Sequence, residues 1–135
     1  MKAKVYLSGP LFSQAEIEWA SRIRTSLESQ LEAEVIWPHE TASGSPQEIF
    51  EANTRALMGC DIMIAILDGP QVDDGTAWEM GYFYSLGKRI VGIRTDFRRA
   101  GETPKSKVNI MLEQSCLSIN ESLEQLIQEL KRILD

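Results

Sequence analysis

Asp61-Ile-Met-Ile-Ala-Ile-Leu67 is the most apolar stretch of the chain, and it decides the fold. After Asp61 the apolar residues follow one another without interruption until the turn sequence Asp68-Gly69-Pro70 ends the run. Continuous apolar character over a short run is typical of a parallel strand that is buried on both faces of its sheet. We therefore expect residues 61–67 to form the central strand of a parallel sheet.

Strand-like and helix-like segments alternate on both sides of this run. The other predicted strands are residues 4–8, 35–37, 89–93 and 115–119. Apolar residues recur at helical spacing in a segment of about 18 residues after Ser13, in 46–59, in 76–86 and from Asn120 or Ser122 to 134. The remaining stretches are a predicted turn (41–45), a long polar loop (95–107) and a short segment (108–112). This alternation predicts an α/β fold, in which a doubly wound, five-stranded parallel sheet carries helices on both faces.

The overall composition limits the partners that we expect. The chain has 135 residues, which is the length of one domain spanning 1–135. It carries 14 Lys and Arg against 20 Asp and Glu, a net charge of −6, which argues against binding to a nucleic-acid polymer or an anionic membrane. No signal peptide or membrane-spanning run is recognisable, so we expect a cytoplasmic protein.

The cysteines and the histidine do not form a metal-binding pattern. Cys60, Cys116 and His39 are far apart in the chain and lack the spacing of zinc ligands. We expect the two cysteines to be buried free thiols, and we expect no metal site.

Carboxylates gather after the central strand. In a doubly wound sheet the ligand lies at the carboxyl ends of the strands, which here selects the loops 8–12, 38–45 and 68–75. The third loop carries Asp68, Asp73 and Asp74, and Glu79 follows one turn into the next helix. Such a carboxylate pair suits glycosyl transfer, where one group attacks the sugar and the other protonates the leaving group. A helix cap beside a surface glutamate explains the same residues, and both interpretations stay open at this point.

The loop after the first strand carries no phosphate-binding motif. Neither GxGxxG nor a Walker A sequence is present. Gly9 would allow close approach of the backbone to a ligand, and Phe12 would either stack on a flat base or belong to the core.

Three segments together resemble the nucleoside 2-deoxyribosyltransferase family: Tyr6-Leu-Ser-Gly-Pro-Leu-Phe12, Asp73-Asp-Gly-Thr-Ala-Trp-Glu-Met-Gly-Tyr82 and Val108-Asn-Ile-Met111. The resemblance runs over nearly the whole chain and implies a flavodoxin-like sandwich. Family enzymes cleave the N-glycosidic bond of 2′-deoxynucleosides by double displacement and pass the sugar to another nucleobase, or to water in the hydrolase branch. The resemblance implies no cofactor.

The resemblance also assigns roles to individual residues. Glu79 matches the nucleophile that forms a covalent deoxyribosyl intermediate, and Asp73 matches the carboxylate that protonates the base. Tyr6 matches the tyrosine whose hydroxyl positions the nucleophile. The expected substrate-binding residues are Ser8, Gly9, Phe12, Asn53, Asp68, Gly75, Asn109 and Met111. Within that set, Phe12 would line the base pocket, and Gly75 would let the backbone pass close to the substrate.

Asn109 matches a residue that a neighbouring subunit supplies, where it holds the sugar 5′-hydroxyl. The expected partners are therefore deoxynucleosides, nucleobases and further copies of the chain, in a homo-oligomer with a shared active site.

Two departures from the family pattern keep alternatives open. Asn53 stands where the well-known transferases carry a second Asp, so the tuning of Asp73 and the rate of transfer are in question. The loop 8–12 lacks the arginine that cradles a 5′-phosphate in the nucleotide hydrolases, although Arg94, Arg98 and Arg99 follow in the long loop. The alternatives to transfer are hydrolysis of a deoxynucleoside or its 5′-monophosphate, and binding of a nucleotide without catalysis.

Overall fold

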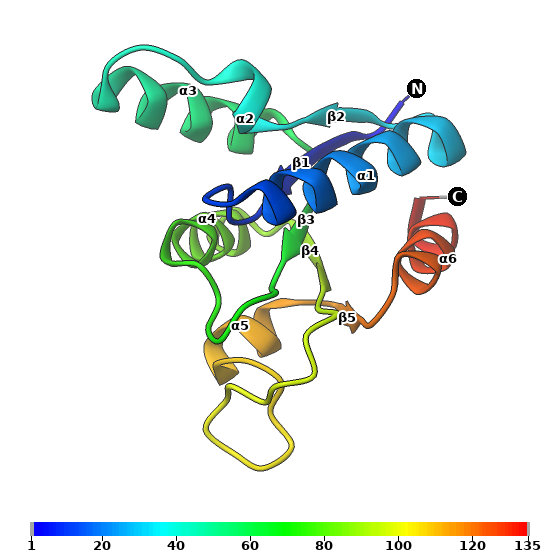
Figure 1. Cartoon of the computed structure of the whole chain (residues 1–135). Helices are drawn as coiled ribbons and strands as arrows, with labels where there is room; N and C mark the ends of the chain where they lie inside the picture. The colour runs from blue at the N-terminus through cyan, green and yellow to red at the C-terminus, as the bar shows by residue number, and fades with distance from the viewer. Residues whose placement is uncertain (1, 135) are drawn as a thin grey trace.

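The computed structural model describes residues 2–134. In these residues strands alternate with helices along the chain, and the strands form one sheet (Figure 1). In chain order the elements are β1 (Lys4–Ser8), α1 (Gln14–Leu31), β2 (Glu34–Ile36), α2 (Pro38–Thr41), α3 (Pro46–Gly59), β3 (Ile62–Ile66), α4 (Asp74–Ser85), β4 (Arg89–Ile93), α5 (Ile110–Ser115), β5 (Ser118–Asn120) and α6 (Leu123–Leu134).

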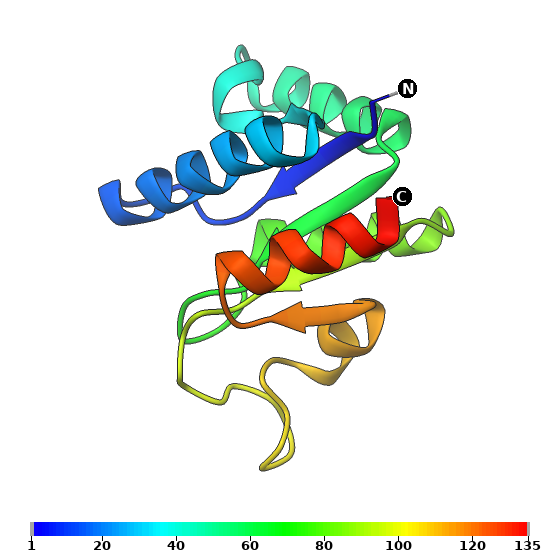
Figure 2. The same ribbon diagram turned by 90° about the vertical axis from the view of Figure 1, so that its right-hand side faces the viewer.

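The five strands of the sheet are all parallel, in the order β2-β1-β3-β4-β5. Figure 2 shows β1, β3 and β5 running in the same direction. From β1 the chain first adds β2 on one side and then crosses back to place β3 on the other. The strand order therefore reverses between β1 and β3, and the loops that follow these two strands flank the switch point. Ligands of doubly wound sheets bind at this position. The fold class predicted from the sequence, a flavodoxin-like sandwich with a five-stranded parallel sheet, is confirmed.

The strand β3 is the centre of the core, as its apolar run predicts. All five of its residues are buried. Ile62 and Ile64 pack in the cluster that contains the inner faces of α1 and α6. Met63 and Ala65 point to the other face and pack with residues of α3 and α4. Because helices cover both faces, β3 has no polar face, which is why its sequence does not alternate.

Two short helices are additions to the predicted pattern. We expected a turn over 41–45 and only a short segment at 108–112, but α2 lies just before that turn and ends at Thr41, and α5 begins within the segment, at Ile110. Pro38 stands at the start of α2, and Asn109 caps α5 by accepting a hydrogen bond from the Met111 N–H at 2.9 Å. Helices of four and six residues are too short to show helical periodicity, so only their caps could have revealed them.

The long loop between β4 and α5 contains no helix or strand, but it is tied to the sheet. The guanidinium of Arg94, which is only 3% exposed, donates to the carbonyls of Leu67 and Arg98. Within residues 2–134 no helix is long and apolar enough to cross a membrane.

Candidate active site

A pocket of about 290 Å³ opens at the switch point between β1 and β3. Its walls come from the end of β1, the start of α2, the middle of α3 and the first turns of α4. The lining residues are Leu7, Ser8, Gly9, Leu11, Pro38, Phe50, Asn53, Thr54, Asp73, Gly75, Thr76, Trp78 and Glu79. The structure thus brings together six of the predicted site residues, namely Ser8, Gly9, Asn53, Asp73, Gly75 and Glu79.

Glu79 lies in the second turn of α4, and hydroxyl groups of β1 hold both of its carboxylate oxygens. Tyr6 donates to Oε2, and Ser8 donates to Oε1 at 2.6 Å. Successive side chains of a strand point to opposite faces, so residues 6 and 8 face α4 together. The interpretation of Glu79 as a free surface residue is therefore wrong, because its carboxylate links α4 to β1 through two hydrogen bonds.

Burial shapes the acidity of this group. Removal from water raises the pKa of Glu79 above its usual value, whereas the hydrogen bonds from Ser8 and Tyr6 lower it and the nearby charge of Asp73 raises it further. Burial and the same carboxylate raise the pKa of Tyr6 well above its usual value, so the phenol keeps its proton and remains a donor. The outcome is a partly desolvated carboxylate with fixed donors, which suits a nucleophile.

Asp73 is both a helix cap and a pocket residue. Its Oδ2 accepts hydrogen bonds from the backbone N–H of Thr76 at 3.0 Å and from the Thr76 hydroxyl at 3.2 Å. These bonds satisfy the first turn of α4 and leave Oδ1 available to the pocket. The capping bonds use Oδ2 alone, so the capping role does not conflict with the expected catalytic role of Asp73.

The two predicted glycines lie in the pocket wall. A Cβ on Gly9 would fall 2.8 Å from Ile66 Cβ, so the packing of the β1 end against β3 excludes a side chain there. A Cβ on Gly75 would lie 3.3 Å from Oδ2 of Asp73. Glycine at position 75 therefore avoids a close contact with the Asp73 carboxylate.

Two aromatic residues of the pocket were missed by the sequence-based prediction. The Phe50 ring on α3 meets Trp78 on α4 edge to face at 5.3 Å between centroids, and Trp78 stacks on Tyr82 at 5.4 Å. Phe50 and Trp78 are each about half exposed and both line the pocket. Trp78 directly precedes Glu79 and could have been found by that position, but nothing in the local sequence of Phe50 marks it as a site residue.

Asp68 does not join the carboxylates of the pocket, contrary to our expectation. Its Oδ1 accepts hydrogen bonds from the N–H groups of Thr95 at 2.6 Å and Asp96 at 2.9 Å. The loops after β3 and β4 lie side by side because those strands are neighbours, and Asp68 connects them. Its carboxylate thus joins the two loops and does not line the pocket.

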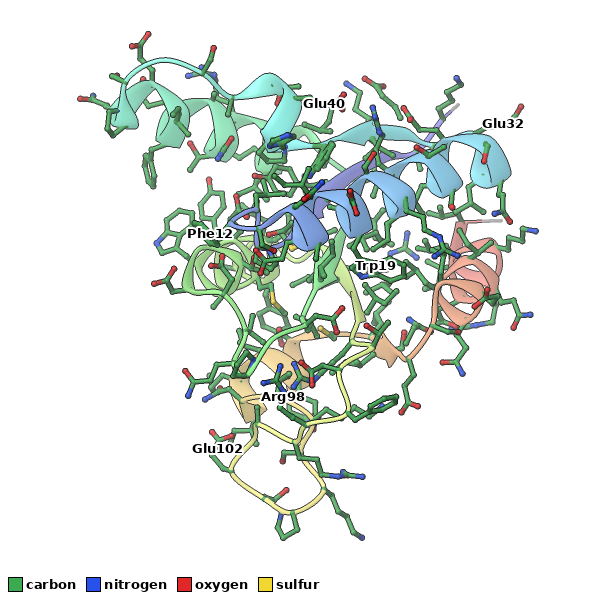
Figure 3. All side chains as sticks on the ribbon, viewed as in Figure 1. Phe12, Trp19, Glu32, Glu40, Arg98 and Glu102 are labelled. Carbon is green, nitrogen blue, oxygen red and sulfur yellow. The ribbon has the colours of Figure 1, made fainter. Side chains whose placement is uncertain are left out.

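Phe12, Asn109 and Met111 also lie outside the lining of the pocket. Phe12 projects from the loop after β1 and is 82% exposed, whereas Arg98 and Glu102 mark the distant loop beyond β4 (Figure 3). Asn109 is exposed and donates to Glu102 Oε2 at 3.1 Å, and Met111 is also exposed. None of the three contacts the Glu79 pocket within one chain.

The arginines of the long loop are engaged elsewhere. The buried Arg94 donates to the Leu67 carbonyl. Arg98 forms an ion pair with Asp96 at 2.6 Å, and Arg99 donates to the Lys105 carbonyl at 3.1 Å. None of them lines the pocket that contains Glu79.

The cysteines are free thiols, as predicted. Cys60 is buried and Cys116 partly buried, and burial raises their pKa values to about 11 and about 12. Across residues 2–134, His, Cys, Asp and Glu side chains form no group of three or more that could hold a metal ion.

Solved structures share this fold over almost the whole chain. A conserved protein from Enterococcus faecalis superposes with a TM-score of 0.86 and 25% identity, covering 98% of this chain and 99% of that one. A 2-deoxyribosyltransferase from Leishmania mexicana superposes with a TM-score of 0.80 and 21% identity, covering 96% and 97%. A 2-deoxyribosyltransferase from Bacillus psychrosaccharolyticus superposes with a TM-score of 0.79 and 24% identity, covering 93% of this chain and 90% of that one.

Sequence comparison identifies the family. An uncharacterized protein of Ureaplasma parvum is 38% identical over 103 residues, which is 66% of this chain and 64% of that protein. The chain thus spans less than two thirds of that relative. The family model described as nucleoside 2-deoxyribosyltransferase matches residues 5–120, which include most of β1, the pocket and the helix α4 with Glu79. This chain belongs to the nucleoside 2-deoxyribosyltransferase family.

Proposed function

We propose that this protein is a nucleoside 2-deoxyribosyltransferase that acts through a covalent deoxyribosyl intermediate on Glu79. The observation that carries the proposal is the position of the Glu79 carboxylate. The buried hydroxyls of Tyr6 and Ser8 both donate to it, in a pocket that also contains Asp73. A pair of carboxylates with different surroundings is the arrangement that retaining glycosyl transfer uses.

The reaction proceeds in two displacements. An oxygen of Glu79 attacks C1′ as the N-glycosidic bond breaks, and the bond's electron pair leaves with the base, which takes a proton from Asp73. An acceptor base then returns a proton to Asp73 and attacks C1′, which releases Glu79. Two inversions at C1′ give net retention. The step needs no co-reactant beyond the two bases.

The pocket favours an uncharged nucleoside over a 5′-phosphate. Its lining contains two carboxylates and no Lys or Arg. The aromatic pair Phe50 and Trp78 offers flat apolar surface for the base, since aromatic rings stack well on one another. We infer that the base lies against these rings, with the sugar deeper beside Glu79.

A second copy of the chain completes the site in this proposal. Asn109 and Met111 face outward at the start of α5, next to an apolar hollow between α4 and α5 that is lined by Ala77, Gly81, Tyr84, Ile110, Met111 and Leu112 among others. Large exposed apolar patches mark interaction sites. In this proposal a neighbouring subunit covers this hollow, and Asn109 reaches the pocket of that neighbour.

Mixing two inactive variants tests the shared site. Glu79→Ala and Asn109→Ala proteins, unfolded and refolded together, would regain activity if each pocket draws on two chains. Refolding each variant alone is the control. Absence of recovery in the mixture, or an active monomer by sedimentation, contradicts the shared site.

A product assay tests the reaction itself. The protein is incubated with deoxyinosine, with and without adenine, and the products are separated. Transfer predicts deoxyadenosine only in the presence of adenine, and mass spectrometry of the quenched protein should show one deoxyribosyl group on the peptide with Glu79. Release of free deoxyribose at an unchanged rate, without deoxyadenosine, would instead establish hydrolysis.

The fold is also compatible with N-glycoside hydrolysis, the first alternative. A CMP N-glycosidase of Clostridium botulinum shares the fold at a TM-score of 0.61 and 22% identity. Binding without catalysis is the second alternative, and it would follow if the wild-type protein cleaved no member of a panel of deoxynucleosides and deoxynucleotides.

A further inference from the structure

Ser8 differs from the other polar groups of the pocket in what it contacts. Its Oγ lies 2.6 Å from Oε1 of Glu79, and its side chain is almost entirely buried, with the residue only 2% exposed. From the sequence we expected a substrate ligand here. The geometry instead commits the hydroxyl hydrogen to the carboxylate.

The strand β1 gives this contact its rigidity. Tyr6 pairs with Met63 and Ser8 with Ala65 of the buried strand β3, so the backbone positions of the two residues are fixed relative to each other. Between them they fix both oxygens, and therefore the plane, of the Glu79 carboxylate. A helix residue held only by its own turn would retain rotamer freedom.

The two oxygens of Glu79 are not equivalent. Ser8 lines the pocket, whereas Tyr6 is fully buried and does not line it. Oε2 is therefore bonded to a residue of the core, whereas Oε1 is bonded to a residue of the pocket wall. This is the oxygen that a sugar in the pocket would approach.

We propose that Ser8 is a positioning residue for the nucleophile and not a substrate ligand: its hydroxyl holds Oε1 of Glu79 toward the pocket in the ionised state. This inference rests on the proposed function for its catalytic consequence. No proton leaves Ser8 during the reaction. Glu79 donates an electron pair to C1′, and the serine hydrogen bond persists beside the new ester.

The charges around Glu79 make this donor important. The titratable groups that act on it are Tyr6 from β1 and Asp73 before α4, and no cation lines the pocket. Ser8 and Tyr6 therefore supply the donors that offset burial and the Asp73 charge. Loss of the Ser8 hydroxyl should raise the pKa of Glu79 further.

The test compares Ser8→Ala with Ser8→Thr, which keeps the hydroxyl. Ser85→Ala is the matched control, because Ser85 lies at the far end of α4 and donates only to the Tyr82 carbonyl. For Ser8→Ala we expect kcat to fall about 10- to 100-fold with little change in KM, the range for a hydrogen bond to a charged group. The acid limb of the pH profile should move to higher pH, and Ser8→Thr should restore both.

A second readout does not depend on activity. The carboxyl carbon of Glu79, labelled with ¹³C, is titrated by NMR in the substrate-free proteins. A higher midpoint in Ser8→Ala than in wild type and Ser85→Ala supports the inference, even if no protein cleaves a nucleoside and the proposed function fails. An unchanged midpoint with an unchanged kcat and a raised KM would overturn it and return Ser8 to substrate binding.

Discussion

The buried hydroxyl of Tyr6 in β1 donates a hydrogen bond to Oε2 of Glu79, 73 positions later in the chain. A residue of the first strand therefore holds the proposed nucleophile of the fourth helix. The two elements meet because α4 follows β3, and β3 is the neighbour of β1 in the sheet.

Tyr6→Phe should slow the reaction and shift its pH dependence. Oε2 of a buried carboxylate then lacks a donor, and since the Tyr6 hydrogen bond lowers the pKa of Glu79, its loss raises that pKa. We expect kcat to fall about 10- to 100-fold, the cost of one hydrogen bond to a charge. Steady-state kinetics across a pH series measures both effects. An acid limb identical to that of the wild type would contradict the assignment.

Glu79 should make stability depend on pH in a defined direction. Its pKa is raised in the folded protein, so the folded state holds the proton more tightly than the unfolded state. The corresponding stability is fully present below the unfolded pKa and is lost as pH rises through the folded pKa. Urea unfolding of wild type and Glu79→Gln over a pH series measures this. The stability of wild type relative to Glu79→Gln should decline as pH rises, and an opposite slope would refute it.

Asp73 carries two functions that separate variants should distinguish. Asp73→Asn keeps a capping oxygen for Thr76 but cannot donate the acid proton, so it should lose activity at nearly wild-type stability. Asp73→Ala should also lose about 0.5–2 kcal/mol of stability with the helix cap. Thermal or urea unfolding combined with the product assay checks both. Full activity of Asp73→Asn on a nucleoside with a basic leaving group would exclude Asp73 as the acid.

The aromatic wall should govern binding of the base. Phe50→Ala and Trp78→Ala remove stacking surface from the pocket but not the carboxylates, so KM should rise about 5- to 30-fold with a smaller change in kcat. Phe97→Ala is the control, because Phe97 is fully exposed and lies on the loop after β4. Equal KM values for all three variants would place the base elsewhere.

Much of the fold and part of the site could be predicted from the sequence. The unbroken apolar run of β3 and the alternation of strands with helices predicted the parallel sheet correctly, because a strand that is buried on both faces is apolar at every residue. Glu79 and Asp73 could be found because they lie in one short segment whose spacing is set by a single helix. The cap Ser13 is a local signal of the same kind, because its hydroxyl oxygen accepts a hydrogen bond from the N–H of Glu16, three positions ahead.

Other features depended on contacts between distant segments. Asp68 and Asp73 are both carboxylates after β3, yet Asp68 turns to the neighbouring loop after β4 while Asp73 caps α4 beside the pocket. Phe12 belongs to a quoted family segment but is exposed, whereas Phe50, which carries no local signal, lines the pocket. The direction of a side chain in these places is set by its tertiary neighbours.

By itself, then, the sequence of this protein determined the parallel sheet, the family and the pair of carboxylates, since each depends on short segments whose residues are close together along the chain. Only the tertiary structure decided that Ser8 joins Tyr6 in holding Glu79, which aromatic rings line its pocket, and which oxygen of Asp73 caps α4. Those properties arise from β1, α3 and α4 meeting at the switch point, and contacts between segments so far apart leave no periodic signal in the chain.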